Sequence, residues 1–207
     1  MNKMNDLKEK VRGIYEQFDA SHDFQHIERV YHNALAILHT EPEADEEVVK
    51  IAVLLHDVSD KKYTDSKEQE EKFISELPMS EEKKQHIRDC IAQVSFNGGN
   101  ELEATSIEAK IVRDADRLDA IGAVGIARTF AYGGAKGRKL YDEAEEARTA
   151  MTEQEYRSKN TSSVTHFYEK LLSLKDLMTT DKGKQMAKER HQFMESFLQQ
   201  LQNEIGK

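Results

Sequence analysis

The feature that most constrains the fold is an apolar stretch at residues 48–55 that ends in His56 and Asp57. β-Branched residues and leucine fill nearly every position, so a helix over about 45–57 is apolar on almost every face and belongs at the centre of a core. A buried imidazole and a buried carboxylate are costly unless they are paired, hydrogen-bonded or bound to a metal. Two interpretations stay open from these residues alone: the pair stabilises and caps helix ends, or it has partners elsewhere in the chain.

Helical periodicity covers most of the remaining sequence. Apolar residues recur at three- and four-residue spacing near 3–18, 27–38, 80–95 and 104–119, and in two segments that close the chain, around 164–174 and 186–201. Two prolines and ten glycines interrupt the 207 residues, which favours helices over many short strands. We therefore predict an all-α fold with one domain over residues 1–207, a core at about 20–130, and C-terminal helices at about 150–205 packed on it.

Charge and composition exclude several classes of protein. An apolar content of 38% is too high for a disordered chain, and a net charge of −9 argues against nucleic acid, which is bound by a basic face. A small phosphorylated ligand in a local basic pocket remains compatible with that charge. The single cysteine, Cys90, favours a reducing compartment. No apolar run approaches the roughly 20 residues of a membrane span, and the first residues lack a signal-peptide core, so we expect a cytoplasmic protein with no membrane partner.

Three places in the sequence carry metal-ligating side chains that helices could bring together: His26, the pair His56 and Asp57, and Asp116. Successive helix residues point about 100° apart, so an adjacent histidine and aspartate reach one ion only from a helix end or a kink. The pair falls at the end of the apolar helix. Two imidazoles and two carboxylates favour a borderline or hard divalent ion with open positions for water and substrate, rather than a structural zinc.

The order His…His-Asp…Asp, in the settings DFQHIERV, LLHDVSDKK and RDADRLDAIGA, resembles the HD-domain metal-dependent phosphohydrolases. The later HFYEKLLSLKDLM and the R-x-x-F-M stretch at 190–194 resemble the bacterial YpgQ/YedJ-like branch. The resemblance covers about residues 20–200 and implies a helical HD-type domain with a metal site between core helices. It implies four metal ligands: His26, His56, Asp57 and Asp116. Asp116 is preferred over the neighbouring aspartates Asp114 and Asp119 because it directly precedes arginine, as in the family's A-D-R setting.

The resemblance also implies a single metal ion. Family members with dinuclear centres have additional histidines between the His-Asp pair and the last aspartate, and that interval here contains only His86. We expect Mn²⁺, with Mg²⁺, Co²⁺ and Fe²⁺ as alternatives that the ligand set does not separate.

Four further residues are candidates for catalysis and substrate binding. Asp60 falls at the family's H-D-x-x-D position, where it would hold or deprotonate the attacking water; the alternative is a helix cap or an ion pair with an adjacent lysine. Lys62 matches the family's D-x-K pattern and would bind phosphate as a point charge. Arg29 and Arg117 are favoured as substrate-binding residues by their adjacency to proposed ligands. Ion pairing with neighbouring acids is the alternative for both.

We therefore expect a metal-dependent phosphohydrolase whose partner is a nucleotide or another small phosphorylated substrate. The branch it resembles points to nucleoside triphosphate pyrophosphohydrolysis, which yields a nucleoside monophosphate and pyrophosphate. A 5′-nucleotide monophosphatase and a non-catalytic, nucleotide-sensing HD domain are the alternatives, and intact ligand positions count against the second. A homodimer is also left open. Residues 132–148 are expected to form an exposed loop, with a lid over a polyphosphate as the alternative.

Overall fold

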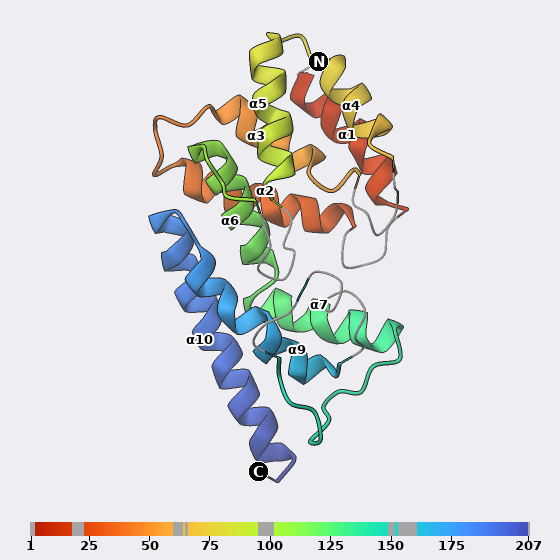
Figure 1. The fold of residues 1–207 in the computed structure, drawn as a ribbon, viewed down its shortest axis with the longest axis vertical. Coiled ribbons are helices and arrows are strands. Elements are labelled where there is room, and N and C mark those ends of the chain that lie inside the picture. The colour runs from red at the N-terminus through yellow and green to blue at the C-terminus, as the bar shows by residue number, and fades with distance from the viewer. Residues whose placement is uncertain are drawn as a thin grey trace. The chain divides into compact units, whose positions relative to one another are not determined.

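The structure, a computed structural model, describes residues 3–17, 23–59, 64, 66–94, 102–148, 152 and 161–206. Every regular element among these residues is a helix (Figure 1). In chain order they are α1 (Lys3–Tyr15), α2 (Phe24–Leu38), α3 (Glu46–Leu55), α4 (Glu68–Ser75), α5 (Glu81–Ala92), α6 (Ile107–Asp119), α7 (Gly122–Ala135), α9 (Ser163–Glu169), the 3₁₀ helix η1 (Leu171–Leu177) and α10 (Asp181–Glu204). The predicted all-α class is confirmed. None of the described helices is long and apolar enough to cross a membrane.

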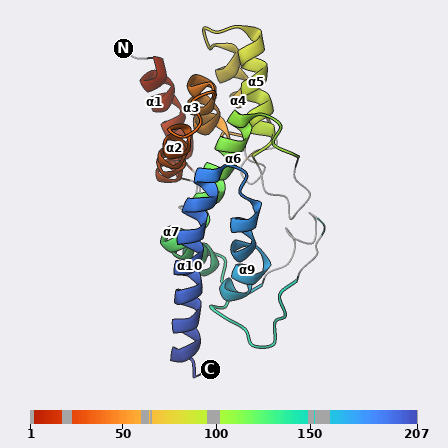
Figure 2. The same ribbon diagram turned by 90° about the vertical axis from the view of Figure 1, so that its left-hand side faces the viewer.

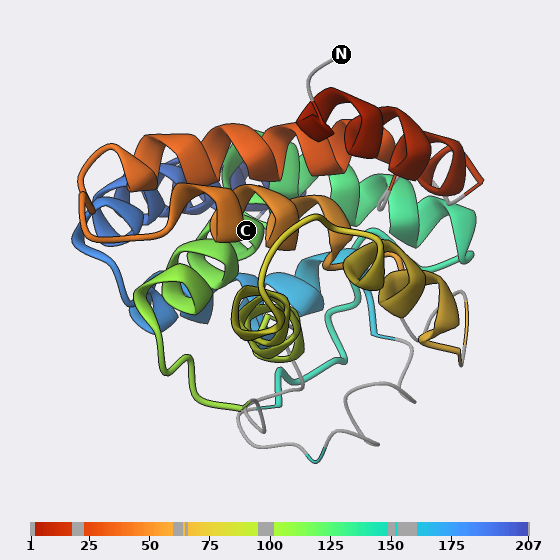
Figure 3. The same ribbon diagram turned by 90° about the horizontal axis from the view of Figure 1, so that it is seen from above.

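The helices group into two compact units, of which the first comprises residues up to Ser95 together with Leu102–Asp116. Helix α3 lies at its centre and contacts α1, α2 and α5. Helices α2 and α3 run side by side (Figure 3). Apart from Lys50, every residue of α3 from Val48 onward is at most 3% exposed. The apolar stretch therefore forms the core helix that the sequence predicts, because no face of it is left for water.

Capping explains where α3 and α2 begin. The Asp45 carboxylate accepts hydrogen bonds from the backbone N–H groups of Glu47 and Val48, and Asp23 accepts one from the N–H of His26. Both carboxylates satisfy donors that a first helical turn leaves without partners, and they also complement the positive end of the helix dipole. The start of α2 therefore fixes His26 in its first turn.

The second unit contains the chain from Arg117 onward, in which α10 packs against α7 and η1 (Figure 2). Its core includes a cluster of three phenylalanine rings, Phe130, Phe167 and Phe197, with centroids 5.8 to 6.1 Å apart. Gly122 begins α7 with a φ of +77°, a conformation that other residues rarely adopt. The space beside its Cα is filled by the Arg190 side chain of α10. Any other residue at position 122 would therefore strain the backbone and crowd the Arg190 side chain.

The prediction of one continuous helix around 164–174 is wrong. Helix α9 ends at Glu169, Lys170 leaves the helical region with φ −137° and ψ −61°, and η1 follows as a 3₁₀ helix. A 3₁₀ turn has three residues, so it aligns Leu171 with Leu174, and both are buried. The same apolar spacing suits either kind of helix, which is why the pattern did not reveal the break.

The expected loop at 132–148 begins later than predicted, because α7 continues to Ala135. After it, Gly137 turns the chain with a φ of +67°. The carbonyl oxygens of Lys139 and Leu140 accept hydrogen bonds from the N–H groups of Ser163 and Val164, which tie this segment to the start of α9. A lid function for the segment stays a prediction.

Candidate metal centre

Three elements of the first unit bring four side chains to one point. His26 comes from the first turn of α2, His56 and Asp57 follow the last turn of α3, and Asp116 comes from α6. The Nε2 atom of His26 lies 3.3 Å from Asp57 Oδ2 and 3.5 Å from Asp116 Oδ1. The Nε2 atom of His56 lies 3.5 Å and 3.7 Å from the same two oxygens. The structure thus places both imidazoles against both carboxylates.

A hydrogen bond to the backbone orients His56. Its Nδ1 lies 2.8 Å from the carbonyl oxygen of Val53, one turn earlier in α3. A carbonyl oxygen can only accept, so Nδ1 carries the hydrogen, and in the neutral ring the lone pair is on Nε2. Ligating histidines commonly donate their other nitrogen to a backbone carbonyl in this way. The helix end therefore directs Nε2 toward Asp57 and Asp116, where this nitrogen would bind an ion in place of its proton.

The separations between these atoms suit a divalent ion. Ligands about 2.1 Å from an ion lie about 3.0 Å apart at right angles and about 3.4 Å apart at the tetrahedral angle. The four distances, 3.3 to 3.7 Å, exceed the right-angle value and lie around the tetrahedral value, so the facing atoms are spaced as the ligands of one ion would be. His26, His56 and Asp57 each offer a ligand atom, and these three atoms all lie within 4.8 Å of one another. The residues present therefore fit a bound cation.

Burial strengthens the electrostatic interactions among the four side chains of the cluster. The two imidazoles are 1% exposed, and the side chains of Asp57 and Asp116 are 14% and 28% exposed. Burial lowers the pKa of His56, but the charges of Asp57 and Asp116 outweigh it and raise that pKa to about 10. Burial raises the pKa of Asp116, whereas His56 and His26 lower it, and the net shift is downward. Asp116 also keeps the most access to solvent of the four, which leaves a side of the cluster open for water or substrate.

The other predicted site residues divide into two groups. Asp60 and Lys62 lie outside the described residues. Arg29 is partly buried in α2, one turn after His26. Arg117 is 5% exposed, and its Nη1 donates a 2.6 Å hydrogen bond to the carbonyl oxygen of Leu177 within the second unit. Part of the Arg117 guanidinium is thus used to anchor η1, and its role toward substrate stays a prediction.

Glu70 is a buried carboxylate that the sequence does not mark as part of a site. Glu70 in α4 is 7% exposed, and burial raises its pKa, while the charges of Lys67 and His56 partly offset that rise. The charge of His56 is among those that act on Glu70, so this carboxylate is electrostatically linked to the cluster. The burial of Glu70 could not be predicted, because it lies within an acidic stretch that is typical of a solvated helix face.

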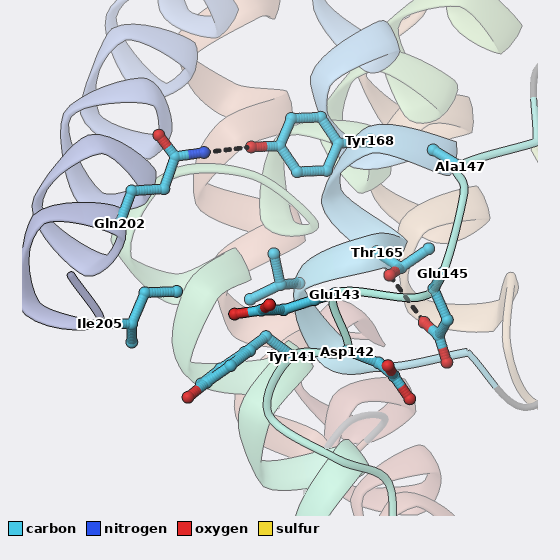
Figure 4. Close-up of a pocket in the computed structure, with 10 residues that line it drawn as sticks. Tyr141, Asp142, Glu143, Glu145, Ala147, Thr165, Tyr168, Gln202 and Ile205 are labelled. Atoms are coloured by element: carbon cyan, nitrogen blue, oxygen red, sulfur yellow. Dashed lines mark hydrogen bonds between the residues drawn. The ribbon is translucent and has the colours of Figure 1, made fainter. Parts of the chain in front are cut away.

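A separate pocket lies within the second unit (Figure 4). Two tyrosines, Tyr141 and Tyr168, line it together with three carboxylates, those of Asp142, Glu143 and Glu145. Glu145 accepts hydrogen bonds from the Ser162 N–H and the Thr165 hydroxyl, so it serves as a cap for α9. Three carboxylates in the lining disfavour a phosphate group, because like charges repel. This pocket is therefore a poor candidate for the phosphates of a nucleotide.

Comparisons with known proteins agree with this geometry. The HD domain family matches residues 23–121, a segment that includes all four side chains of the cluster. The chain is 37% identical over 201 residues to the uncharacterised protein YpgQ of Bacillus subtilis strain 168, which covers 94% of this chain and 90% of YpgQ.

Solved structures extend the likeness over nearly the whole chain. A protein from Lactobacillus plantarum matches with a TM-score of 0.84 at 31% identity, covering 98% of this chain and 96% of its own. The complex of B. subtilis YpgQ with ADP matches with a TM-score of 0.79 at 34% identity, covering 99% and 95%. An HD-superfamily hydrolase from Bacillus thuringiensis matches with a TM-score of 0.76 at 38% identity, covering 99% and 98%.

Proposed function

The chain belongs to the YpgQ-like members of the HD-superfamily hydrolases, and from this premise we propose that it is a metal-dependent phosphohydrolase of nucleotides. More specifically, we propose a nucleoside triphosphate pyrophosphohydrolase that releases a nucleoside monophosphate and pyrophosphate. The observation that carries the proposal is the convergence of His26, His56, Asp57 and Asp116, with 3.3 to 3.7 Å between their facing atoms. A mixed set of nitrogen and oxygen ligands that is open to solvent at Asp116 is more typical of a hydrolytic metal site than of a closed structural one.

The relative crystallised with ADP supports a nucleotide substrate. ADP carries a base, a ribose and two phosphates, so the YpgQ protein accommodates more than a single phosphate group. This favours a nucleoside polyphosphate over a monophosphate as the substrate here, and so favours the pyrophosphohydrolase over the 5′-nucleotidase. The intact set of four cluster residues counts against a domain that senses a nucleotide without cleaving it.

The proposal assigns one role to the four side chains of the cluster and other roles to residues near them in the sequence. A divalent ion held by the four side chains would lower the pKa of a bound water and neutralise charge on the attacked phosphoryl group. His56 is held in orientation by the carbonyl of Val53, and so keeps its Nε2 directed at the ion position. Asp60 is proposed as the base that holds or deprotonates water, and Lys62, Arg29 and Arg117 as phosphate-binding groups.

We further propose that a single Mn²⁺ ion occupies the centre. Among the described residues, the grouping of potential ligand atoms falls at this one point, which supports a mononuclear site. His86 is the one histidine between the His56-Asp57 pair and Asp116, and its Nε2 lies 3.2 Å from the Glu108 carboxylate and 3.1 Å from the Ser106 hydroxyl. The contacts of His86 are therefore with residues outside the cluster.

Product analysis tests the proposal. The purified protein is incubated with Mn²⁺ and each deoxynucleoside triphosphate, monophosphate and diphosphate, and products are separated by anion-exchange chromatography and assayed for pyrophosphate and inorganic phosphate. We expect pyrophosphate and a monophosphate from triphosphates, and no turnover by Asp57→Ala. Inorganic phosphate from monophosphates would instead identify a nucleotidase. Nucleotide binding without any turnover would identify a sensing domain, and turnover by Asp57→Ala would remove the metal centre from the mechanism.

A further inference from the structure

The last turn of α3 has carbonyl groups that lie beyond the helical hydrogen-bond ladder. The Val53 carbonyl accepts from His56, as described above. The next carbonyl, that of Leu54, accepts a 3.0 Å hydrogen bond from the hydroxyl of Tyr15 at the end of α1. Tyr15 and Leu54 are both fully buried. A tyrosine from α1 therefore caps the helix end from which His56 and Asp57 emerge, two residues before the first ligand.

A similar contact lies beside the third ligand segment. The Nδ2 group of Asn33 in α2 donates a 3.0 Å hydrogen bond to the carbonyl oxygen of Ala115 in α6, directly before Asp116. Asn33 is 6% exposed and lies on the same helix as His26, seven residues or about two turns further along. Helix α2 thus supplies one ligand itself and braces the backbone that carries another.

We propose that Tyr15 and Asn33 are positioning residues of the metal centre. Through the carbonyls of Leu54 and Ala115 they hold the two backbone segments that deliver His56, Asp57 and Asp116. The inference rests on the proposed metal site, and it assigns no contact with substrate to either residue. It also extends the site beyond the matched HD segment, since Tyr15 lies before residue 23, where that segment begins.

The chemistry of the two side chains argues against a purely space-filling role. Packing alone would be served by phenylalanine at position 15 and by leucine at position 33, with no polar group to desolvate. Instead, each polar group is buried and bonded to a backbone carbonyl one or two residues from a ligand. Metal sites tolerate ligand displacements of only about 0.2 Å, so a brace of this kind has a measurable effect on affinity.

Mn²⁺ binding to the whole protein tests this without reference to turnover. Free Mn²⁺ is measured by electron paramagnetic resonance during titration of the wild type, Tyr15→Phe and Asn33→Leu. Loss of groups that orient metal ligands commonly weakens affinity about 10- to 100-fold, and these act one step further out, so we expect about 3- to 10-fold for each variant. The spectrum of bound Mn²⁺ is also expected to broaden or shift, because the ligand geometry relaxes.

Two controls separate positioning from general destabilisation. Tyr168→Phe removes an exposed hydroxyl that accepts from Gln202, in the second unit. Thr180→Ala removes the buried N-cap of α10 and is expected to lower the melting temperature. Both are expected to bind Mn²⁺ with the wild-type dissociation constant. Should Asn33→Leu fail to fold, Asn33→Ala replaces it, and Tyr15→Phe removes a single oxygen atom in any case.

The outcomes distinguish this inference from the proposed function. Wild-type affinity and spectrum in folded Tyr15→Phe and Asn33 variants would overturn the positioning role and leave the hydrolase proposal standing. Weakened binding in Thr180→Ala as well would also overturn it, because affinity would then follow stability. Weakened binding in the positioning variants, with no nucleotide hydrolysis by the wild type, would support positioning and remove the proposed reaction. A wild type that binds no Mn²⁺ would overturn both.

Discussion

His56 donates its Nδ1 hydrogen to the carbonyl oxygen of Val53 at 2.8 Å. This hydrogen bond orients the imidazole ring at the end of the core helix α3. The acceptor is a backbone group at the end of α3, where helical carbonyls need partners in any case. The bond keeps a hydrogen on Nδ1 and directs Nε2 toward Asp57 and Asp116. The final turn of the buried helix therefore orients a histidine that we propose as a metal ligand.

Asp116 and Asp119 are expected to respond to alanine substitution in opposite ways. Asp116 faces both histidines, whereas Asp119 is 1% exposed and pairs with Arg128 at 2.6 Å. Asp116→Ala should abolish Mn²⁺-dependent turnover with little loss of stability. Asp119→Ala leaves a largely buried arginine without this carboxylate and should cost about 3 kcal/mol of unfolding free energy while retaining Mn²⁺ binding. Urea denaturation and Mn²⁺ titration of both variants check this, and the reverse pattern would show that the ligand in α6 is misassigned.

Bound metal is expected to stabilise the fold. A ligand that binds only the native state at a hundred times its dissociation constant adds about 2.7 kcal/mol to the free energy of unfolding. Saturating Mn²⁺ should therefore raise the melting temperature by several degrees, and excess EDTA should reverse the shift. Differential scanning fluorimetry measures both. His56→Ala is the control, and an equal shift in that variant would place the stabilising ion elsewhere.

The protein is expected to lose stability between pH 7 and pH 5 through His166. Burial lowers the pKa of His166 to about 3, with the charges of Lys170 and Arg138 adding to the shift. An unfolded histidine binds its proton near pH 6.5, so protons favour the unfolded state over this interval, and the stability that is present above pH 6.5 is lost as the pH falls. The loss should be about 1 to 2 kcal/mol. Denaturant titrations at pH 5, 6 and 7 measure it, and His166→Gln should show a flatter dependence; an unchanged slope would contradict the assignment.

The single cysteine is expected to be inert in the native protein. Cys90 is fully buried in α5, and burial raises the pKa of its thiol to about 12, so the reactive thiolate is scarce at neutral pH. A chromogenic disulfide reagent should therefore label the native protein slowly and the urea-unfolded protein at once. Rapid labelling under native conditions would show that α5 opens readily.

The sequence predicted the parts of this molecule that depend on patterns of side chains. The apolar run before His56 indicated a central helix, and α3 is that helix, with Val48 to Leu55 buried apart from Lys50. The three ligand settings fall on α2, the end of α3 and α6, as their order implied, and the structure brings their side chains together. The core helix could be predicted because burial follows the spacing of apolar residues, and the cluster because its three settings resemble those of the HD-domain family.

Contacts with backbone carbonyls could not be predicted in the same way. Ion pairing with neighbouring acids is the alternative that the sequence suggests for Arg117, and nothing in the sequence indicates that its Nη1 donates to the carbonyl oxygen of Leu177. Every residue has a carbonyl oxygen, so the sequence contains no mark of which one is used. The hydrogen bonds of Tyr15 to Leu54 and of Asn33 to Ala115 were hidden for the same reason.

The most direct test of the central claim is an anomalous difference map from crystals of the protein soaked in Mn²⁺. We predict one strong peak within about 2.3 Å of His26 Nε2, His56 Nε2 and an oxygen each of Asp57 and Asp116. Asp57→Ala crystals treated identically should lack that peak. A wild-type map with no peak among these four side chains, or with its strongest peak elsewhere, would show that they do not form the metal site.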